Sequence, residues 1–223
     1  MGVNNIGKKK LHIFLLILTV ITVVFMVSTV VANKASAINV SVNDDKIEVY
    51  VGSTSGLTTA EARNYLEQRS NYLNEISNSH PSSMSDALIV LSDFISTNEL
   101  KDIIGMPEEI KTVYIWVPNK TGRAILNVKG NDISATISDF FDSLDLENET
   151  DEVFKNDMLK LMDNYGIFAV EVRASNLELA DLQGKNIISS VDVLYNSSAE
   201  QLSAKENRPI SYVCIPDKPD GTY

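Results

Sequence analysis

The sequence has few of the residues that carry covalent and metal chemistry in proteins. Its 223 residues include one cysteine and two histidines. A single cysteine excludes a disulfide scaffold and a structural zinc site built from several thiolates. The first 43 residues contain no Asp or Glu, although the whole chain has 30 of them. Because 44% of the residues are hydrophobic and 22% are charged, the composition excludes disorder of the whole chain.

The basic residues are distributed unevenly along the chain. Lys8, Lys9, Lys10 and Lys34 are four of the 19 Lys and Arg, so the remaining sequence has 15 basic and 30 acidic residues, a net charge of −15. A domain with this charge repels phosphates and anionic lipid head groups. We therefore do not expect it to bind nucleic acid.

Leu11–Val31 is an uncharged run of 21 residues that directly follows the lysine triplet, with His12 at its edge. As a helix it would span about 32 Å, which matches a hydrocarbon core of about 30 Å. The run predicts a transmembrane signal-anchor. The positive-inside rule places residues 1–10 in the cytoplasm as a short tail and the remaining chain outside.

A cleaved signal peptide is the alternative for the same segment. Ala35-Ser36-Ala37 matches an A-x-A cleavage site, and cleavage at Ala37 would release the rest of the chain as a secreted protein. The hydrophobic part of a signal peptide is usually about 7–15 residues long, which favours the uncleaved anchor. Both interpretations export the domain.

Residues 32–45 are predicted to form a linker, and residues 46–85 a strand followed by an amphipathic helix. Lys46–Val51 alternates polar and apolar residues. Thr58 and Glu61 form a capping-box pattern that opens the helix. The helix is expected to pack on the domain through one stripe and to end before a loop at Asn78–Ser85; the stripe comprises Ala62, Tyr65, Leu66, Leu73 and Ile76.

Residues 86–223 contain a pattern that occurs twice. A strand at Ala87–Leu91 precedes Ser96–Gly105, and a strand at Ile167–Val172 precedes Ser175–Gly184, 79 positions later. Each of the later segments has a capping box and a terminal glycine, which predicts a short helix. A second strand follows each helix, at Ile110–Val117 and at Ile188–Tyr195. The repeat predicts two β-α-β units, each with parallel strands.

The expected fold is α+β, with two ferredoxin-like β-α-β units and a mixed sheet. The remaining predicted elements are strands at Arg123–Val128 and Ile210–Ile215 and helices at Ile133–Leu144, Asp151–Tyr165 and Ser198–Glu206. The succession of a strand, a short S-x-x-E-L helix and an I-x-x-V strand resembles that of subtilisin propeptides. That resemblance implies a ferredoxin-like fold and a protease-inhibitor or propeptide-like role.

We predict no catalytic, cofactor-binding or metal-binding residue. His12 lies at the membrane edge and His80 precedes a proline in a polar loop, so neither is expected to activate a nucleophile. Cys214 lies in an apolar strand and is predicted to be a buried thiol without a basic neighbour. Trp116 either anchors a partner or belongs to a strand buried on both faces, and the second interpretation is favoured.

The acidic run Asp142–Glu152 is the one candidate calcium ligand set. It lacks the D-x-D-x-D-G order, and leucines alternate with its acids, so we predict a connection between two helices.

The expected function is that of a single-pass membrane-anchored protein with a non-enzymatic extracytoplasmic interaction or sensory domain and a protein partner. Two alternatives stay open: an extracytoplasmic carboxylate-dependent hydrolase, which needs two facing carboxylates, and the protease-inhibitor or propeptide-like module.

Overall fold

The computed structural model describes residues 40–42, 45–54, 57–105, 107–116, 123–144, 152, 166–195 and 197–217. These residues divide into two compact units. One unit contains the described residues up to Ile47 and those from 197 to 210, and the other contains the described residues of 48–195 and 211–217.

The chain has a three-stranded sheet in the order β1-β2-β8, formed by Val40–Val42, Ile47–Val51 and Ile210–Cys214. The Ile47 N–H donates to Pro209 O at 2.9 Å, and the Ile215 N–H donates to Val51 O at 2.9 Å, so β2 and β8 run parallel. The strand predicted at Lys46–Val51 is confirmed, with alternate residues buried. β1 lies inside the segment that the sequence predicts to be a linker. The sequence does not indicate this strand, because three residues are too few to show an alternation of polar and apolar side chains.

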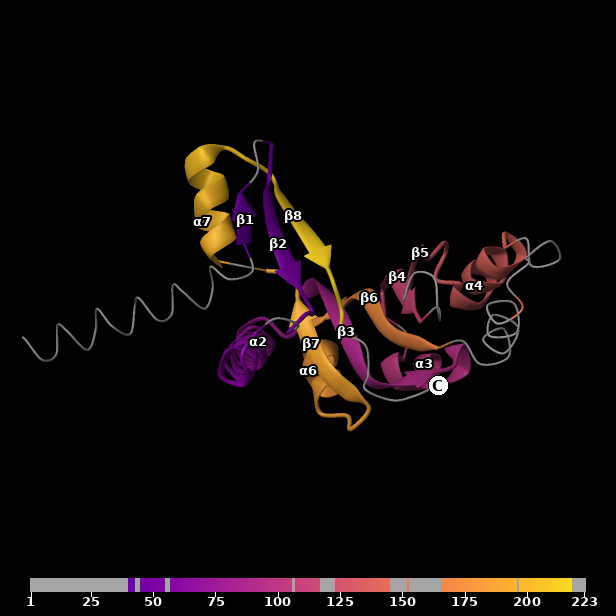
Figure 1. Ribbon diagram of the computed structural model, residues 1–223. Helices are drawn as coiled ribbons and strands as arrows, with labels where there is room; N and C mark the ends of the chain where they lie inside the picture. Colours follow the sequence, from indigo (N-terminus) through magenta and orange to yellow (C-terminus); the bar gives the residue numbers. More distant parts are fainter. Residues whose placement is uncertain are drawn as a thin grey trace, which may run out of the picture. The chain divides into compact units, whose positions relative to one another are not determined.

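A five-stranded sheet has the order β5-β4-β6-β3-β7 (Figure 1). All four pairs of neighbouring strands in this sheet, β5–β4, β4–β6, β6–β3 and β3–β7, are antiparallel. The bounds are β3 Met84–Ile95, β4 Glu109–Ile115, β5 Ala124–Asn127, β6 Ile167–Ser175 and β7 Ile188–Val193.

The two predicted β-α-β segments are interleaved in this sheet. β3 and β4 are both antiparallel to β6, which lies between them, so they run parallel to each other. β6 and β7 are likewise parallel, with β3 between them. The mixed α+β class is therefore confirmed. The chain has two sheets, and the mixed one is the three-stranded sheet, which contains β8, whereas the β-α-β segments lie in the antiparallel five-stranded sheet.

The helices of the two segments begin as the sequence predicts. Ser96 caps α3 (Thr97–Ile104) and Ser175 caps α6 (Asn176–Gln183), and each serine forms a complete capping box with the Glu three residues later. The Glu99 and Glu178 N–H groups each donate to the serine Oγ at 3.3 Å. A serine hydroxyl and a glutamate carboxylate thus satisfy backbone donors that a helix start leaves open.

Helix α2 (Thr59–Ser79) also begins with its predicted capping box, between Thr58 and Glu61. Leu73 is buried, but Leu66 is 38% exposed, so the predicted apolar stripe does not pack along its full length. The predicted loop at Asn78–Ser85 is shorter than expected, because α2 continues to Ser79 and β3 begins at Met84.

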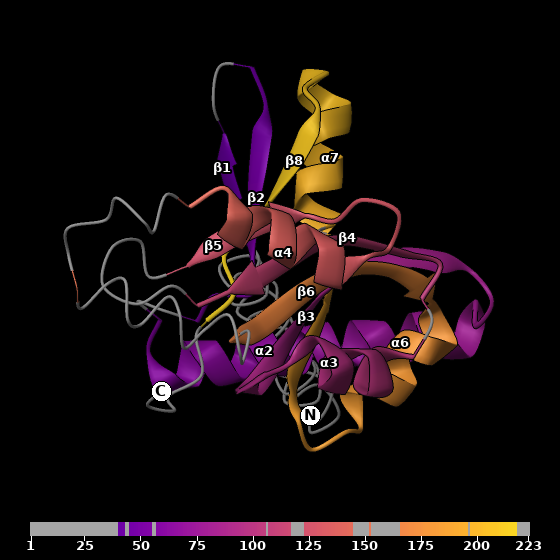
Figure 2. The ribbon, with the colours of Figure 1, turned by 90° about the vertical axis from the view of Figure 1, so that its right-hand side faces the viewer.

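The main core lies between the five-stranded sheet and four helices. Side chains from α2, α3, α4 (Ile133–Asp142) and α6 pack against one face of the sheet, and Figure 2 shows the helices and the sheet from a second direction. The fully buried members include Leu73, Leu100, Ile137 and Leu179 from the helices and Ala87, Ile89, Val113 and Val170 from the strands. α7 (Ser197–Glu206) belongs to the other unit.

No helix within the described ranges is long and apolar enough to cross a membrane. The predicted anchor at Leu11–Val31 and all but Glu152 of the predicted helix at Asp151–Tyr165 lie outside these ranges.

Candidate functional site

The candidate site is the second face of the five-stranded sheet, opposite the main core. Because side chains alternate along a strand, Ala87, Ile89 and Leu91 of β3 point into the main core while Leu88 and Val90 point to the second face. The same alternation places charged residues of β3 and β6 on this face. The charged side chains Asp86, Glu171 and Arg173 are therefore found on this face of the sheet.

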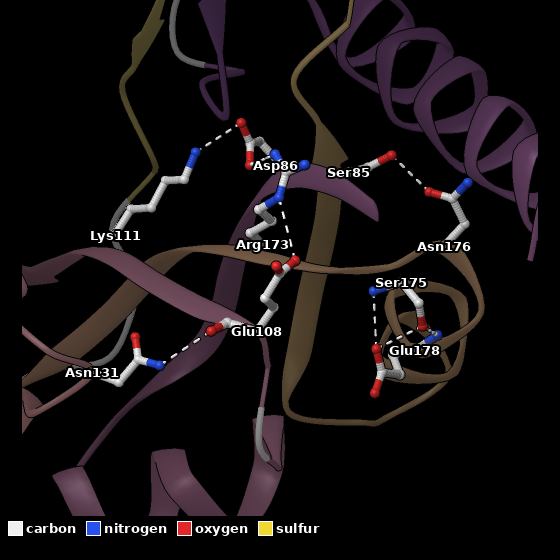
Figure 3. A network of polar contacts seen from close by, with 9 residues as sticks. All are labelled: Ser85, Asp86, Glu108, Lys111, Asn131, Arg173, Ser175, Asn176 and Glu178. Atoms are coloured by element: carbon white, nitrogen blue, oxygen red, sulfur yellow. Dashed lines mark hydrogen bonds and ion pairs between the residues drawn. The ribbon is translucent and has the colours of Figure 1, made fainter. Parts of the chain in front are cut away.

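Four charged residues form a network at one end of the second face (Figure 3). Asp86 of β3 binds Lys111 of β4 at 2.8 Å and Arg173 of β6 at 3.3 Å. The Arg173 Nε also lies 3.4 Å from Glu108 Oε2. Their side chains are 32–57% exposed, so water screens these ion pairs and each contributes little to stability. The network holds two cations and two anions in fixed positions at the surface.

The surroundings of the network position these charges. Asn131, which follows β5 and has φ = 60°, accepts from the Ile110 N–H at 2.8 Å and donates to Glu108 O at 3.2 Å. Asn is one of the few residues besides glycine that adopt this conformation readily. Its side chain ties the start of β4 to the turn after β5, which fixes the backbone beside Lys111.

Aromatic side chains occupy the other end of the second face. Phe168 packs edge-to-face against Phe94 and Tyr114, with ring centroids 6.1 and 6.3 Å apart. Trp116 follows β4 directly and lies against Phe94, with centroids 6.5 Å apart. Such pairs contribute about 0.5–1.5 kcal/mol beyond the area they bury. The face thus passes from a charged end to an aromatic end.

Glu171 lies between these two ends. The Tyr114 hydroxyl donates to its carboxylate, and Cys214 is a partly buried neighbour in the same apolar cluster. Burial, followed by the negative charge of Glu171, raises the pKa of the Cys214 thiol well above its usual value. Burial also raises the pKa of Tyr114. A thiol in this setting stays protonated at neutral pH and is a weak nucleophile.

Asp192 of β7 carries the most buried charge that the structure describes. Its side chain is 2% exposed and pairs with the Arg69 guanidinium of α2. It also accepts from the Tyr65 hydroxyl and from the Gly52 N–H, the latter at 3.2 Å. A buried charge needs such partners, because removing an ion from water without them costs several kcal/mol. Burial and then Asp192 raise the pKa of Tyr65, so its hydroxyl remains a donor.

Gly52 is required at this junction. Its φ is +82°, and a Cβ there would lie 2.2 Å from Leu88 Cδ2 and 3.3 Å from the Pro216 Cα. Any side chain at this position would have a strained backbone and would collide with Leu88 of the second face.

The structure describes three of the residues singled out from the sequence, His80, Cys214 and Trp116, whereas His12 lies outside the described ranges. His80 is exposed and ends α2, where its carbonyl accepts from Asn176 Nδ2 at 2.8 Å. Cys214 is partly buried in β8, and the interior of β4 is buried from Thr112 to Ile115, which supports a strand covered on both faces. The structure brings Cys214 and Trp116 to the same cluster but does not bring His80 there.

Sequence reasoning missed Asp192 and Glu171. The signal for both is a carboxylate inside a strand: Glu171 lies in IFAVEV and Asp192 lies in ISSVDV. Such a residue is either at an exposed position of an alternating strand or is a buried charge with a partner. The sequence does not name that partner, because Arg69 is 123 positions away from Asp192.

Among the described residues no group of three or more His, Cys, Asp or Glu could hold a metal ion. Residues 145–151 of the acidic run Asp142–Glu152 lie outside the described ranges, so the connection between two helices that was expected there, in preference to a calcium site, stays a prediction.

Comparison with protein-family models, with curated proteins and with solved structures finds no match to this chain.

Proposed function

We propose that this chain is a single-pass membrane protein whose α+β domain lies outside the cytoplasm and binds a protein partner through the exposed, charged end of the second face of the sheet. The membrane part of the proposal rests on the uncharged run Leu11–Val31 after Lys8, Lys9 and Lys10. The binding part rests on one observation. A network of half-exposed charged side chains lies at one end of the second face, on three adjacent strands of the sheet.

This network suits protein recognition. Exposed charges that are held in fixed positions steer a partner toward the surface and set its register. Asp86, Lys111 and Arg173 come from three adjacent strands, so their spacing is fixed by backbone hydrogen bonds.

Photo-crosslinking in intact cells tests the proposed surface. A photoreactive amino acid at exposed Glu109, which pairs with Arg173 across β4 and β6, is expected to crosslink to a specific protein. The matched control places the same amino acid at exposed Asp102 of α3, on the helix-covered side. Arg173→Glu should abolish the Glu109 crosslink while leaving the domain folded. The same set of products from Glu109 and from Asp102 would contradict the proposal.

The orientation has its own test. Protease added to intact cells should digest the domain, and mass analysis of the mature chain distinguishes the anchored form from one cleaved at Ala37. Complete protection of the domain in intact cells would overturn the extracytoplasmic location.

The strand order favours a second candidate, the protease-inhibitor or propeptide-like module. We infer a ferredoxin-like split β-α-β from the interleaving of β4, β6, β3 and β7, and subtilisin propeptides have a ferredoxin-like fold. Titration of a subtilisin-type protease with the purified chain tests this candidate. Stoichiometric inhibition would support it, and simple degradation of the chain would exclude it.

A further inference from the structure

Strand β5 ends the five-stranded sheet on one side, among the strands that the structure describes. The Val128 N–H donates to Lys111 O at 2.8 Å, so Val128 and every second residue before it turn their backbone groups toward β4. Ile125 and Asn127 lie between those residues, and their N–H and C=O groups therefore point away from the sheet. Within the described ranges these outward groups have no hydrogen-bond partner.

The side chains of the same two residues lie on the second face of the sheet. Ala124 and Leu126 pack against the main core. Because side chains alternate along a strand, Ile125 and Asn127 lie on the other face. The Ile125 side chain is 52% exposed. An incoming strand would thus find backbone donors and acceptors beside an apolar side chain, which is the combination that strand addition uses.

Two cations flank this edge. Arg123 precedes β5 and is half-buried, whereas Lys129 follows β5 and is exposed. Neither side chain forms an ion pair with any residue that the structure describes. The domain as a whole is acidic, but charges are screened beyond about 8 Å at physiological ionic strength. The two cations therefore decide which charges a segment bound at this edge would meet.

The same cations disfavour pairing between two copies of the chain. Antiparallel pairing of Ile125 with Asn127 of a second copy would place Arg123 opposite Lys129 at both ends of the pair. Like charges directly opposite each other destabilise a pair of strands, whereas opposite charges stabilise it. The edge thus favours a segment that carries carboxylates over a copy of itself.

We propose that the β5 edge binds an extended, acidic segment of another protein as an added strand. The backbone of that segment pairs with the outward groups of Ile125 and Asn127, and one of its apolar side chains covers Ile125. Its carboxylates lie beside Arg123 and Lys129. The contact uses none of the four residues of the charged network, so the inference goes beyond the proposed function.

Fluorescence anisotropy with labelled synthetic peptides tests this proposal on the full chain in detergent. The probe is a short peptide of alternating Glu and Val. One comparison peptide alternates Lys and Val, and the other is the Glu–Val peptide with all its backbone nitrogens methylated. Only the unmethylated Glu–Val peptide should bind, because the Lys–Val peptide has the wrong charge and the methylated peptide has no N–H to donate.

Variants of the chain locate the binding at the β5 edge. Ile125→Pro removes an outward N–H and breaks no bond to β4, a position at which an edge strand tolerates proline. It should weaken binding of the Glu–Val peptide by about tenfold relative to Ile125→Ala, which keeps the N–H. Arg123→Glu combined with Lys129→Glu should abolish binding. The matched control, Lys101→Glu combined with Lys205→Glu, makes the same charge change at exposed positions of α3 and α7 and should retain it.

Several results would overturn the proposal. These are no binding of the Glu–Val peptide to the unaltered chain, equal binding of either comparison peptide, or equal affinities for the folded Ile125→Pro and Ile125→Ala variants. If Ile125→Pro does not fold, the two double charge variants decide, and equal losses in both would overturn it. Arg173→Glu, on a strand that is not adjacent to β5, should keep the peptide binding, so this proposal and the proposed function fail separately.

Discussion

The two β-α-β segments start alike and end differently. α3 and α6 have the same capping box and the same length, and each leads into a strand that runs parallel to the one before it. The second strand of the first segment, β4, lies inside the sheet because β5 pairs with it. The second strand of the other segment, β7, is an edge strand of the sheet.

The same strand-helix-strand pattern therefore ends in an interior strand in one segment and in an edge strand in the other. β4 is completed by backbone hydrogen bonds to β5, whereas at the end of β7 the Val193 carbonyl accepts from the Arg69 guanidinium and from the Tyr195 N–H. The similarity of the segments is therefore local, and their different surroundings come from elements outside the repeat.

The largest expected effect is at the ion pair between α2 and β7. Arg69→Ala leaves Asp192 buried and unpaired, and we expect the free energy of unfolding to fall by about 3–5 kcal/mol. Arg173→Ala, in the exposed network of β6, should change it by only about 0–1 kcal/mol. Urea denaturation of both variants measures the contrast. Equal losses would mean that the Asp192 pair contributes no more than a surface ion pair.

Alanine substitutions of the glycines that end α3 and α6 are expected to change the stability of the protein in opposite directions. Gly105 has φ = 69° and ψ = −135°, a region that side chains disfavour, whereas Gly184 has an ordinary helical conformation. Gly105→Ala should destabilise the protein by about 1–3 kcal/mol. Gly184→Ala meets only Asp181 O at 3.6 Å and should stabilise it by about 0.4–1 kcal/mol. Thermal melts would contradict the comparison if both changes had the same sign.

The starts of the helices should respond alike. Ser96→Ala and Ser175→Ala each remove a hydroxyl acceptor from a capping box and should cost about 0.5–2 kcal/mol. Ser82→Ala, in the exposed turn after α2, is the matched control and should cost much less. Ser197 lies just before the helix that the sequence predicts at Ser198–Glu206, but α7 begins at Ser197, so this residue does not serve as a control. A clear difference between the Ser96 and Ser175 variants would break the equivalence of the segments.

The smallest expected effect is a pH dependence of these caps. Hydrogen bonds from the Ser96 backbone and hydroxyl lower the pKa of Glu99, and those from the Ser175 hydroxyl and backbone lower the pKa of Glu178. Because both folded pKa values lie below the usual 4.5, the contribution is present above that pH and is lost as pH falls through the folded values. Chemical denaturation between neutral pH and about pH 3 should show the penalty of Ser96→Ala shrinking on acidification. A penalty that grew instead would exclude this linkage.

Local elements were predictable because their signals are short in sequence. The capping boxes at Thr58, Ser96 and Ser175 lie within four residues, and the strands at β2, β4 and β5 show their apolar patterns directly. The interleaving of the segments was not predictable, because a β-α-β pattern does not state which strand fills the space between its two parallel strands. The strand β8 was predicted, but its partner β2 is more than 150 positions away.

The candidate site shows the same division. Asp86, Lys111 and Arg173 are ordinary charged residues in the sequence, and the strand register alone brings them together on one face. By itself the sequence determined the acidic composition, the segment that resembles a membrane anchor, the helix starts and most strands. Each of these depends on neighbouring residues or on simple counts. Only the tertiary structure decided the strand order, the burial of Asp192 and its pairing with Arg69, because pairing across more than a hundred residues depends on the packing of the whole domain.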